Sequence, residues 1–128
     1  MNDRRILVVD DDAPCRDALV EFLHREGYRV SIAKDGTEAF QVIRRVRFDC
    51  SVMDVHMPGL TGLEVIRRLV AEPTPPQSIP PTVFVSSDRS VEQTVRSLAG
   101  PPVGFIPKPI QLDALRRTLQ LLLRPGFS

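Results

Sequence analysis

Five polar residues of this sequence stand at or just after the ends of short apolar runs. They are Asp10, Asp11, Asp54, Ser86 and Lys108. If the apolar runs are parallel strands, their carboxyl ends meet at one edge of a sheet, where open α/β proteins bind ligands. The sequence therefore predicts a shallow cleft that gathers three carboxylates, a hydroxyl and an ammonium group.

The residue types in this cleft indicate phosphoryl chemistry. Clustered carboxylates favour protonation unless a cation joins them, and oxygen ligands suit Mg²⁺ or Mn²⁺ better than zinc. With a metal present, one carboxylate can stay ionised and attack a phosphoryl group, while the lysine and the metal neutralise the phosphoryl oxygens. The hydroxyl then donates to the phosphoryl oxygen of the product. We interpret the set as an aspartyl-phosphate site.

Two of the aspartates in these runs need separate explanations. The segment "SVMDVHMPG" (51–59) ends an apolar run on Asp54, and a carboxylate at the tip of a buried strand is unfavourable unless it is paired. Asp12, in contrast, is explained as the N-cap of the first helix, with Pro14 in its first turn.

Apolar runs alternate with segments of helical period along the whole chain. The expected strands are residues 6–9, 29–33, 50–53, 82–86 and 103–107. A helix is expected after each strand. Gly27 should end the first helix, Thr37 should cap the second, and Ser90 with Gln93 should form a capping box at the fourth. Strict alternation implies a parallel sheet with right-handed crossovers.

The character of the strands predicts their order. The first, third and fourth runs are almost continuously apolar, as expected when helices cover both faces of a strand. Residues 29–33 alternate instead, and Pro107 ends the fifth run, so these two strands should lie at the edges. The expected fold is α/β, a flavodoxin-like (βα)5 doubly wound parallel sheet in the order 2-1-3-4-5.

Composition predicts one soluble domain over residues 1–128, with a core of about 4–124. Lys and Arg (17) nearly balance Asp and Glu (16), so neither nucleic acid nor a membrane is expected as a partner. No run approaches the ~20 apolar residues of a membrane span. Cys15 and Cys50 are expected to be reduced, in a cytoplasmic protein. The five prolines of 72–81 predict an extended loop, with a proline-rich docking motif as the alternative.

Four motifs give the chain a family resemblance over about residues 4–124. They are "ILVVDDD" (6–12), "DVHMPGLTGLE" (54–64), "VFVSSD" (83–88) and "GFIPKP" (104–109). In this order, the chain resembles the receiver domains of response regulators in two-component signalling, including the chemotaxis-regulator type. The resemblance implies that Asp54 is the phosphoacceptor. It also implies a metal held by Asp11, Asp54, the backbone carbonyl of His56 and, through water, Asp10.

The resemblance assigns roles to further residues. Lys108 would contact the phosphoryl group, and its bond to Pro109 would be cis, which an X-Pro bond permits at low energy. Ser86 and Phe105 would form the switch. Without a hydroxyl, Phe105 can act only through packing.

His56 and Asp88 each follow a key site residue by two positions, Asp54 and Ser86 respectively. The resemblance places both beside the path of attacking water, so they are expected to tune the phosphoryl lifetime. The His56 side chain would donate to the phosphoryl group or pair with Asp88. The alternative is a solvent-exposed histidine without a kinetic role.

The family implies a signalling switch rather than an enzyme, with self-catalysed phosphotransfer to Asp54 and autodephosphorylation. A sensor histidine kinase or histidine phosphotransfer protein would donate the phosphoryl group. The fourth helix, fifth strand and fifth helix would then signal to a downstream effector or fused output domain, or form a phosphorylation-dependent homodimer. Two alternatives are a degenerate, phosphorylation-independent docking module and a Mg²⁺-dependent phosphatase, although "DVH" lacks the second aspartate of haloacid-dehalogenase-type phosphatases.

Overall fold

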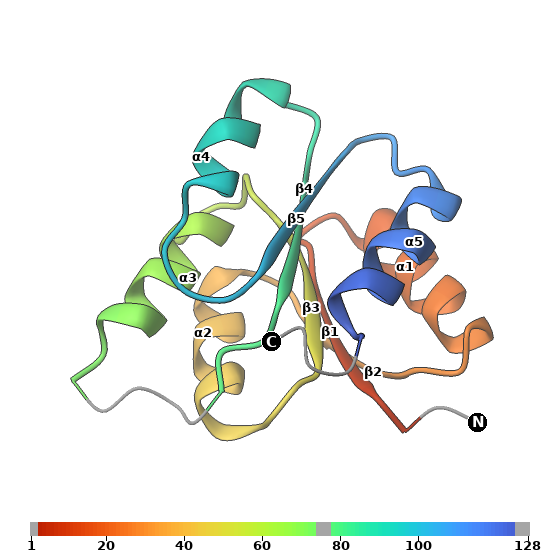
Figure 1. Ribbon diagram of the computed structural model, residues 1–128, viewed down its shortest axis with the longest axis horizontal. Coiled ribbons are helices and arrows are strands. Elements are labelled where there is room, and N and C mark those ends of the chain that lie inside the picture. The colour runs from red at the N-terminus through yellow and green to blue at the C-terminus, as the bar shows by residue number, and fades with distance from the viewer. Residues whose placement is uncertain (1–2, 74–77, 125–128) are drawn as a thin grey trace.

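A computed structural model describes residues 3–73 and 78–124, in which five strands alternate with helices (Figure 1). The strands are β1 (Arg5–Val9), β2 (Arg29–Ala33), β3 (Cys50–Asp54), β4 (Thr82–Ser86) and β5 (Val103–Pro107). The helices are α1 (Ala13–Arg25), α2 (Gly36–Arg45), α3 (Gly62–Ala71), α4 (Glu92–Arg96) and α5 (Leu112–Leu122), and a 3₁₀ turn, η1 (Arg89–Val91), precedes α4. Every expected strand is present.

The strands form one parallel sheet in the order β2-β1-β3-β4-β5, which confirms the predicted order. β3 and β4 are buried along their whole length, whereas β2 and β5, at the edges, are partly exposed. The carboxyl ends of β1, β3 and β4 therefore lie side by side at one edge of the sheet.

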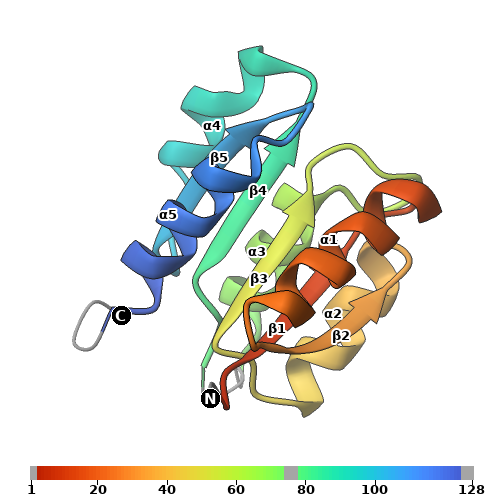
Figure 2. The same cartoon turned by 90° about the vertical axis from the view of Figure 1, so that its right-hand side faces the viewer.

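Helices cover both faces of the sheet. α1 and α5 pack on one face, and α2, α3 and α4 pack on the other (Figure 2). Side chains along β1 alternate between the two faces, so Ile6 and Val8 join the α1–α5 core while Leu7 and Val9 join the other. Two separate apolar layers thus hold the strand ends in fixed positions.

The caps of the first two helices show one success and one error. Asp12 caps α1 as predicted, accepting a hydrogen bond from the Cys15 N–H at 3.2 Å. Gly27 follows the end of this helix with φ of 92°. The prediction for α2 was wrong, because Asp35 rather than Thr37 is its N-cap and accepts from the Glu38 N–H at 2.8 Å. Asp35 has the extended backbone that an N-cap needs, so the helix begins before Thr37.

The predicted capping box at the fourth helix was also wrong. Asp88 caps the η1 turn, and its Oδ1 accepts from both the Ser90 N–H and the Ser90 hydroxyl. The N-cap of α4 is Val91, which starts the helix after Ser90, and α4 has no side-chain cap. Among the described residues, a capping box is present at α3 instead, between Thr61 and Glu64.

Other expectations concern the loop and the cysteines. Residues 74–77 of the proline-rich segment lie outside the described residues, and the end of the segment accepts hydrogen bonds from β3 and β4. Cys15 and Cys50 are both free thiols, and burial raises the pKa of Cys50 to about 12. Within 3–73 and 78–124, no helix has the length and apolar character needed to cross a membrane.

Candidate functional site

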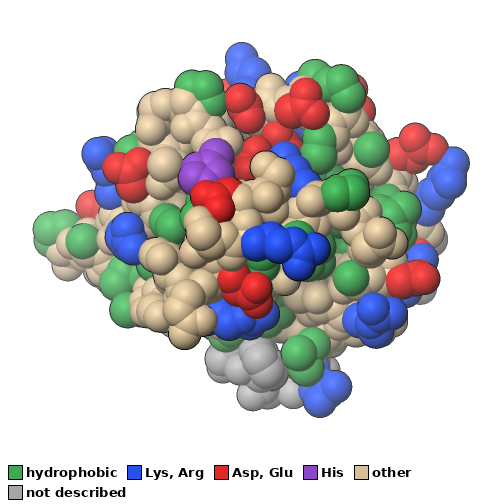
Figure 3. Space-filling model, turned by 90° about the horizontal axis from the view of Figure 1, so that it is seen from above, with side chains coloured by type: hydrophobic (Ala, Val, Ile, Leu, Met, Phe, Trp, Pro, Cys, Tyr) green, Lys and Arg blue, Asp and Glu red, His purple; other side chains and the backbone are tan. Residues whose placement is uncertain are grey.

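Three aspartates meet at the carboxyl edge of the sheet, as the sequence predicts. Asp10, Asp11 and Asp54 each place a carboxylate oxygen within 4.8 Å of the others. Asp10 and Asp54 are buried, whereas Asp11 is exposed. Figure 3 views this edge from above and shows acidic side chains gathered next to basic side chains and a histidine. The burial of two neighbouring carboxylates requires a compensating positive charge.

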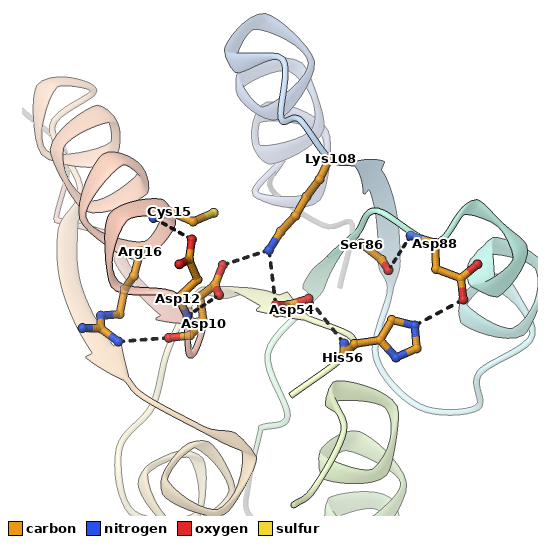
Figure 4. A network of polar contacts seen from close by, with 9 residues as sticks. All are labelled: Asp10, Asp12, Cys15, Arg16, Asp54, His56, Ser86, Asp88 and Lys108. Atoms are coloured by element: carbon orange, nitrogen blue, oxygen red, sulfur yellow. Dashed lines mark hydrogen bonds and ion pairs between the residues drawn. The ribbon is translucent and has the colours of Figure 1, made fainter. Parts of the chain in front are cut away.

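Lys108 supplies positive charge to this cluster. Its Nζ lies 3.3 Å from Asp10 Oδ2 and 3.2 Å from Asp54 Oδ2, so one ammonium bridges both buried carboxylates (Figure 4). The lysine follows β5 directly, and its backbone N–H donates to the carbonyl of Ser86 at 2.9 Å. The Lys108–Pro109 bond is cis, as the resemblance implied. The end of β5 thus places the ammonium group over the ends of β1 and β3.

Burial and the neighbouring charges shift the pKa of Asp54 and of Lys108. Burial raises the pKa of Asp54, the charge of Asp10 raises it further, and Lys108 partly offsets both. Burial alone would lower the pKa of Lys108, but the two carboxylates raise it above its usual value. The ammonium group therefore stays charged at neutral pH, where it can neutralise anionic oxygens brought to Asp54.

The β1–α1 loop fixes Asp10. The Asp12 N–H donates to Asp10 Oδ1 at 2.9 Å, so the residue that caps α1 also holds the Asp10 carboxylate. Burial and the neighbouring Asp10 carboxylate raise the pKa of the Cys15 thiol to about 11. Sequence reasoning expected only a reduced thiol at Cys15 and overlooked its proximity to the site.

A chain of hydrogen bonds joins Asp54 to Ser86 (Figure 4). The His56 N–H donates to Asp54 Oδ1 at 3.3 Å, and His56 Nε2 lies 3.3 Å from Asp88 Oδ2. The Asp88 N–H donates to the Ser86 hydroxyl oxygen at 3.0 Å. Hydrogen bonds from Ser90, then His56, lower the pKa of Asp88. The predicted pairing of His56 with Asp88 is therefore present as a contact.

The two residues predicted to form the switch differ in their surroundings. Ser86 is buried at the end of β4, whereas Phe105 is half-buried on β5 and packs against the core on the α2–α3–α4 face. The structure thus places Ser86 at the acidic cluster and Phe105 on an edge strand. The backbone carbonyl of His56 stays a predicted metal ligand.

Gly62, which sequence reasoning missed, packs against the backbone of Asp54. A Cβ at Gly62 would lie 2.5 Å from the Asp54 carbonyl oxygen, so only glycine allows the start of α3 to pack this closely. The Gly62 N–H also donates to the carbonyl of Val55 at 2.9 Å. A glycine at the first position of a helix that follows an active-site turn is the only sequence signal for this contact.

The donor set fits a divalent cation of the Mg²⁺ type. Asp10, Asp11 and Asp54 offer only carboxylate oxygens, which are hard ligands. Three converging carboxylates with a single bridging lysine also leave an excess of negative charge. A cation would remove this repulsion.

Comparisons with known proteins agree with this architecture. The family model for the response regulator receiver domain matches residues 6–120. The chain is 40% identical over 120 residues to the response regulator MprA of Mycobacterium leprae (strain TN), covering 94% of this chain and 51% of that protein. The chain thus spans about half the length of the curated relatives it matches.

Two solved structures extend the comparison. The chemotaxis response regulator CheY4 of Vibrio cholerae has a TM-score of 0.82 and 28% identity, covering 95% of this chain and 100% of that chain. The receiver domain of the sensor histidine kinase PA1611 from Pseudomonas aeruginosa PAO1 has a TM-score of 0.79 and 26% identity. That match covers 95% of this chain and 98% of the other, whose structure has a magnesium ion coordinated in its active site cleft.

Proposed function

Because the chain belongs to the response regulator receiver domain family, we propose that it is a phosphorylation-activated switch of a two-component system or phosphorelay. A sensor histidine kinase or histidine phosphotransfer protein donates a phosphoryl group to Asp54. The observation that carries the proposal is a buried Asp54 bridged by Lys108 to Asp10 at the carboxyl edge of the sheet.

The residues of the site divide the work of transfer. An Asp54 carboxylate oxygen forms the new O–P bond while the P–N bond to the donor imidazole breaks, and the imidazole keeps the electron pair. Lys108 neutralises charge on the phosphoryl oxygens. Asp11, Asp54, the His56 carbonyl and, through water, Asp10 would hold Mg²⁺ or Mn²⁺. When bound, the ion supplies further positive charge to those oxygens. The domain itself catalyses the transfer and the later hydrolysis of the phosphorylated Asp54.

Phosphorylation then changes the partners of two residues. The modification adds up to about −2 charge and new acceptor oxygens. The Ser86 hydroxyl now accepts from the Asp88 N–H, which leaves its own proton free to donate to a phosphoryl oxygen. When Ser86 moves toward the phosphoryl group, the β4–α4 loop moves with it. The Phe105 side chain then shifts toward the protein interior. The α4–β5–α5 face changes shape and signals to an effector or output domain, or forms a homodimer.

Phosphoryl uptake by Asp54→Asn tests the site assignment. Wild type and variant are incubated with acetyl phosphate and Mg²⁺, and the mass increase of one phosphoryl group is followed by intact-protein mass spectrometry. Asp17→Asn is the matched control, because Asp17 is exposed on α1 away from the cluster. We expect uptake by wild type and by the control, and none by Asp54→Asn. Uptake by Asp54→Asn at the wild-type level would show that the acceptor lies elsewhere.

His56 and Asp88 tune the lifetime of the phosphoryl group in this proposal. Their side chains make a contact of 3.3 Å, and we place this pair beside the path of the attacking water. His56→Ala is expected to shorten the lifetime several-fold, and Asp88→Ala to shorten it less, because the imidazole stays in place. The measurement is loss of phosphoryl after removal of the donor. Equal lifetimes for wild type and His56→Ala would leave His56 without a kinetic role.

The proposal also covers the compartment of the protein, the extent of the domain and its lack of direct contact with nucleic acid. We place it in the cytoplasm, where histidine kinases present their phosphohistidine, and we assign residues 1–128 to one receiver domain. A near-neutral net charge gives the domain no nucleic-acid surface of its own. Any contact with DNA belongs to an effector or fused output domain.

A further inference from the structure

The guanidinium group of Arg16 holds the peptide unit between the two acidic residues of the β1–α1 loop. An Arg16 NH1 hydrogen donates to the carbonyl oxygen of Asp10 at 3.1 Å (Figure 4), and that carbonyl belongs to the peptide bond that leads into Asp11. The Arg16 backbone N–H donates to the carbonyl of Asp12 at 2.9 Å. One residue of α1 therefore fixes the loop on both sides of Asp11.

Asp11 depends on this backbone contact more than the other two carboxylates do. Lys108 and the Asp12 N–H hold the Asp10 side chain, and Lys108 and the His56 N–H hold that of Asp54. Within the described residues, the Asp11 carboxylate makes no hydrogen bond or ion pair. Its position is therefore set by the torsion angles of the peptide units on either side of it, one of which Arg16 holds.

The burial of Arg16 indicates that the contact is a specific one. Its Nε is buried and, among the described residues, has no hydrogen-bond partner, which is unfavourable for a donor removed from water. An arginine that served only the solubility of the surface would keep its guanidinium group in solvent. The hydrogen bond from Arg16 NH1 to the Asp10 carbonyl offsets part of this unfavourable burial.

We propose that Arg16 is a positioning residue, which sets the place of the Asp11 carboxylate through the Asp10–Asp11 peptide and so sets the affinity of the site for a divalent cation. This inference rests on the proposed function of the site. Electrostatics alone predict the opposite sign, because removing a positive charge near a cation site should strengthen cation binding. The direction of the change therefore distinguishes positioning from simple charge repulsion.

Mn²⁺ binding to the unphosphorylated protein tests the inference. Free Mn²⁺ is measured by electron paramagnetic resonance during titration of wild type, Arg16→Ala, Arg16→Lys and Arg25→Ala. Arg25 is the matched control, since it lies at the other end of the same helix and, among the described residues, pairs with Glu21 alone. Loss of a residue that orients a ligand typically weakens metal binding 10–100-fold, so about tenfold weaker binding is expected for Arg16→Ala. Arg16→Lys, which keeps the charge and one donor, should lie between it and wild type.

The results separate the inference from the proposed function. Absence of Mn²⁺ binding by wild type overturns the metal site and the inference together. Normal binding by wild type with equal or tighter binding by Arg16→Ala overturns the role of Arg16 alone. Thermal unfolding of each variant without metal shows which variants are folded, because only a folded protein gives a cooperative transition. If Arg16→Ala does not fold, Arg16→Lys decides, and an affinity equal to those of wild type and Arg25→Ala refutes positioning.

Discussion

Substitution of Gly62 by alanine should damage the site through the backbone of Asp54. The new Cβ would lie 2.5 Å from the Asp54 carbonyl oxygen and 3.2 Å from Met53 Cγ, against 3.4 Å for an ordinary contact. The start of α3 and the end of β3 must therefore separate by as much as 0.9 Å, the difference between 3.4 and 2.5 Å. Overpacking of this kind destabilises a protein by about 1–3 kcal/mol. The higher helix propensity of alanine returns at most about 1 kcal/mol.

Urea unfolding followed by circular dichroism measures the loss of stability. With a slope of about 1–3 kcal/mol per molar urea, a net loss of 1–2 kcal/mol lowers the midpoint by about 1 M. Phosphoryl uptake from acetyl phosphate with Mg²⁺ measures the displacement of Asp54. Because a misplacement of 1 Å can reduce a rate about 100-fold, a shift of about half that size should slow uptake roughly tenfold.

Gly59 provides the control in the same loop. Its φ of 76° strains any other residue, but a Cβ there would contact nothing within 4 Å. Gly59→Ala should therefore lose about 1–2 kcal/mol of stability through backbone strain while leaving the rate of uptake unchanged. If Gly62→Ala keeps both its midpoint and its rate, or slows uptake no more than Gly59→Ala, the close packing of α3 on Asp54 does not govern the site.

Three further predictions concern Asp54, the metal site and the buried hydroxyls of Ser51 and Thr82. Asp54→Asn should stabilise the protein at pH 7, because burial and Asp10 raise the folded-state pKa of the carboxyl, so that its ionised form is unfavourable above that pKa. The gain should vanish below about pH 3.8, where Asp54 is protonated in both states; a gain that is constant with pH would contradict this origin. Mg²⁺ at ten times its dissociation constant should raise the unfolding free energy of wild type by about 1.4 kcal/mol. Asp11→Asn should reduce this stabilisation, and an undiminished effect would place the ion elsewhere. Thr82→Val should destabilise by about 1–3 kcal/mol by leaving the buried Ser51 hydroxyl without its 2.7 Å partner, and adding Ser51→Ala should recover part of the loss in a double-mutant cycle. Additive effects would show that the two hydroxyls are not coupled.

The fold and the residues at the strand ends could be predicted from the sequence, because both depend on local patterns. Apolar runs alternating with helical periods give the parallel sheet, and the character of each run gives the strand order. The carboxyl-end rule then brings Asp10, Asp54 and Lys108 together. The pairing of His56 with Asp88 was one of the two partners that the family resemblance implied for the His56 side chain, and the contact is present.

The features that sequence reasoning missed depend on close approach between distant segments. Gly62 matters because α3 packs on the Asp54 carbonyl, and Arg16 matters because its side chain reaches back to Asp10. No periodicity encodes either contact. The two capping errors arose because aspartates at 35 and 88 compete with Thr37 and Ser90 for the same role, and backbone geometry decides between them.

The brevity of α4 has a consequence for the energy that a signal needs. The helix has five residues, of which only Val95 is buried, and it lacks a side-chain cap. A helix this short is not stable in isolation, so its local opening free energy should be well below that of global unfolding. Its amides should therefore exchange with deuterium sooner than those of α1 or α5. A modification at Asp54 can remodel this segment through sub-global fluctuations while the sheet stays folded.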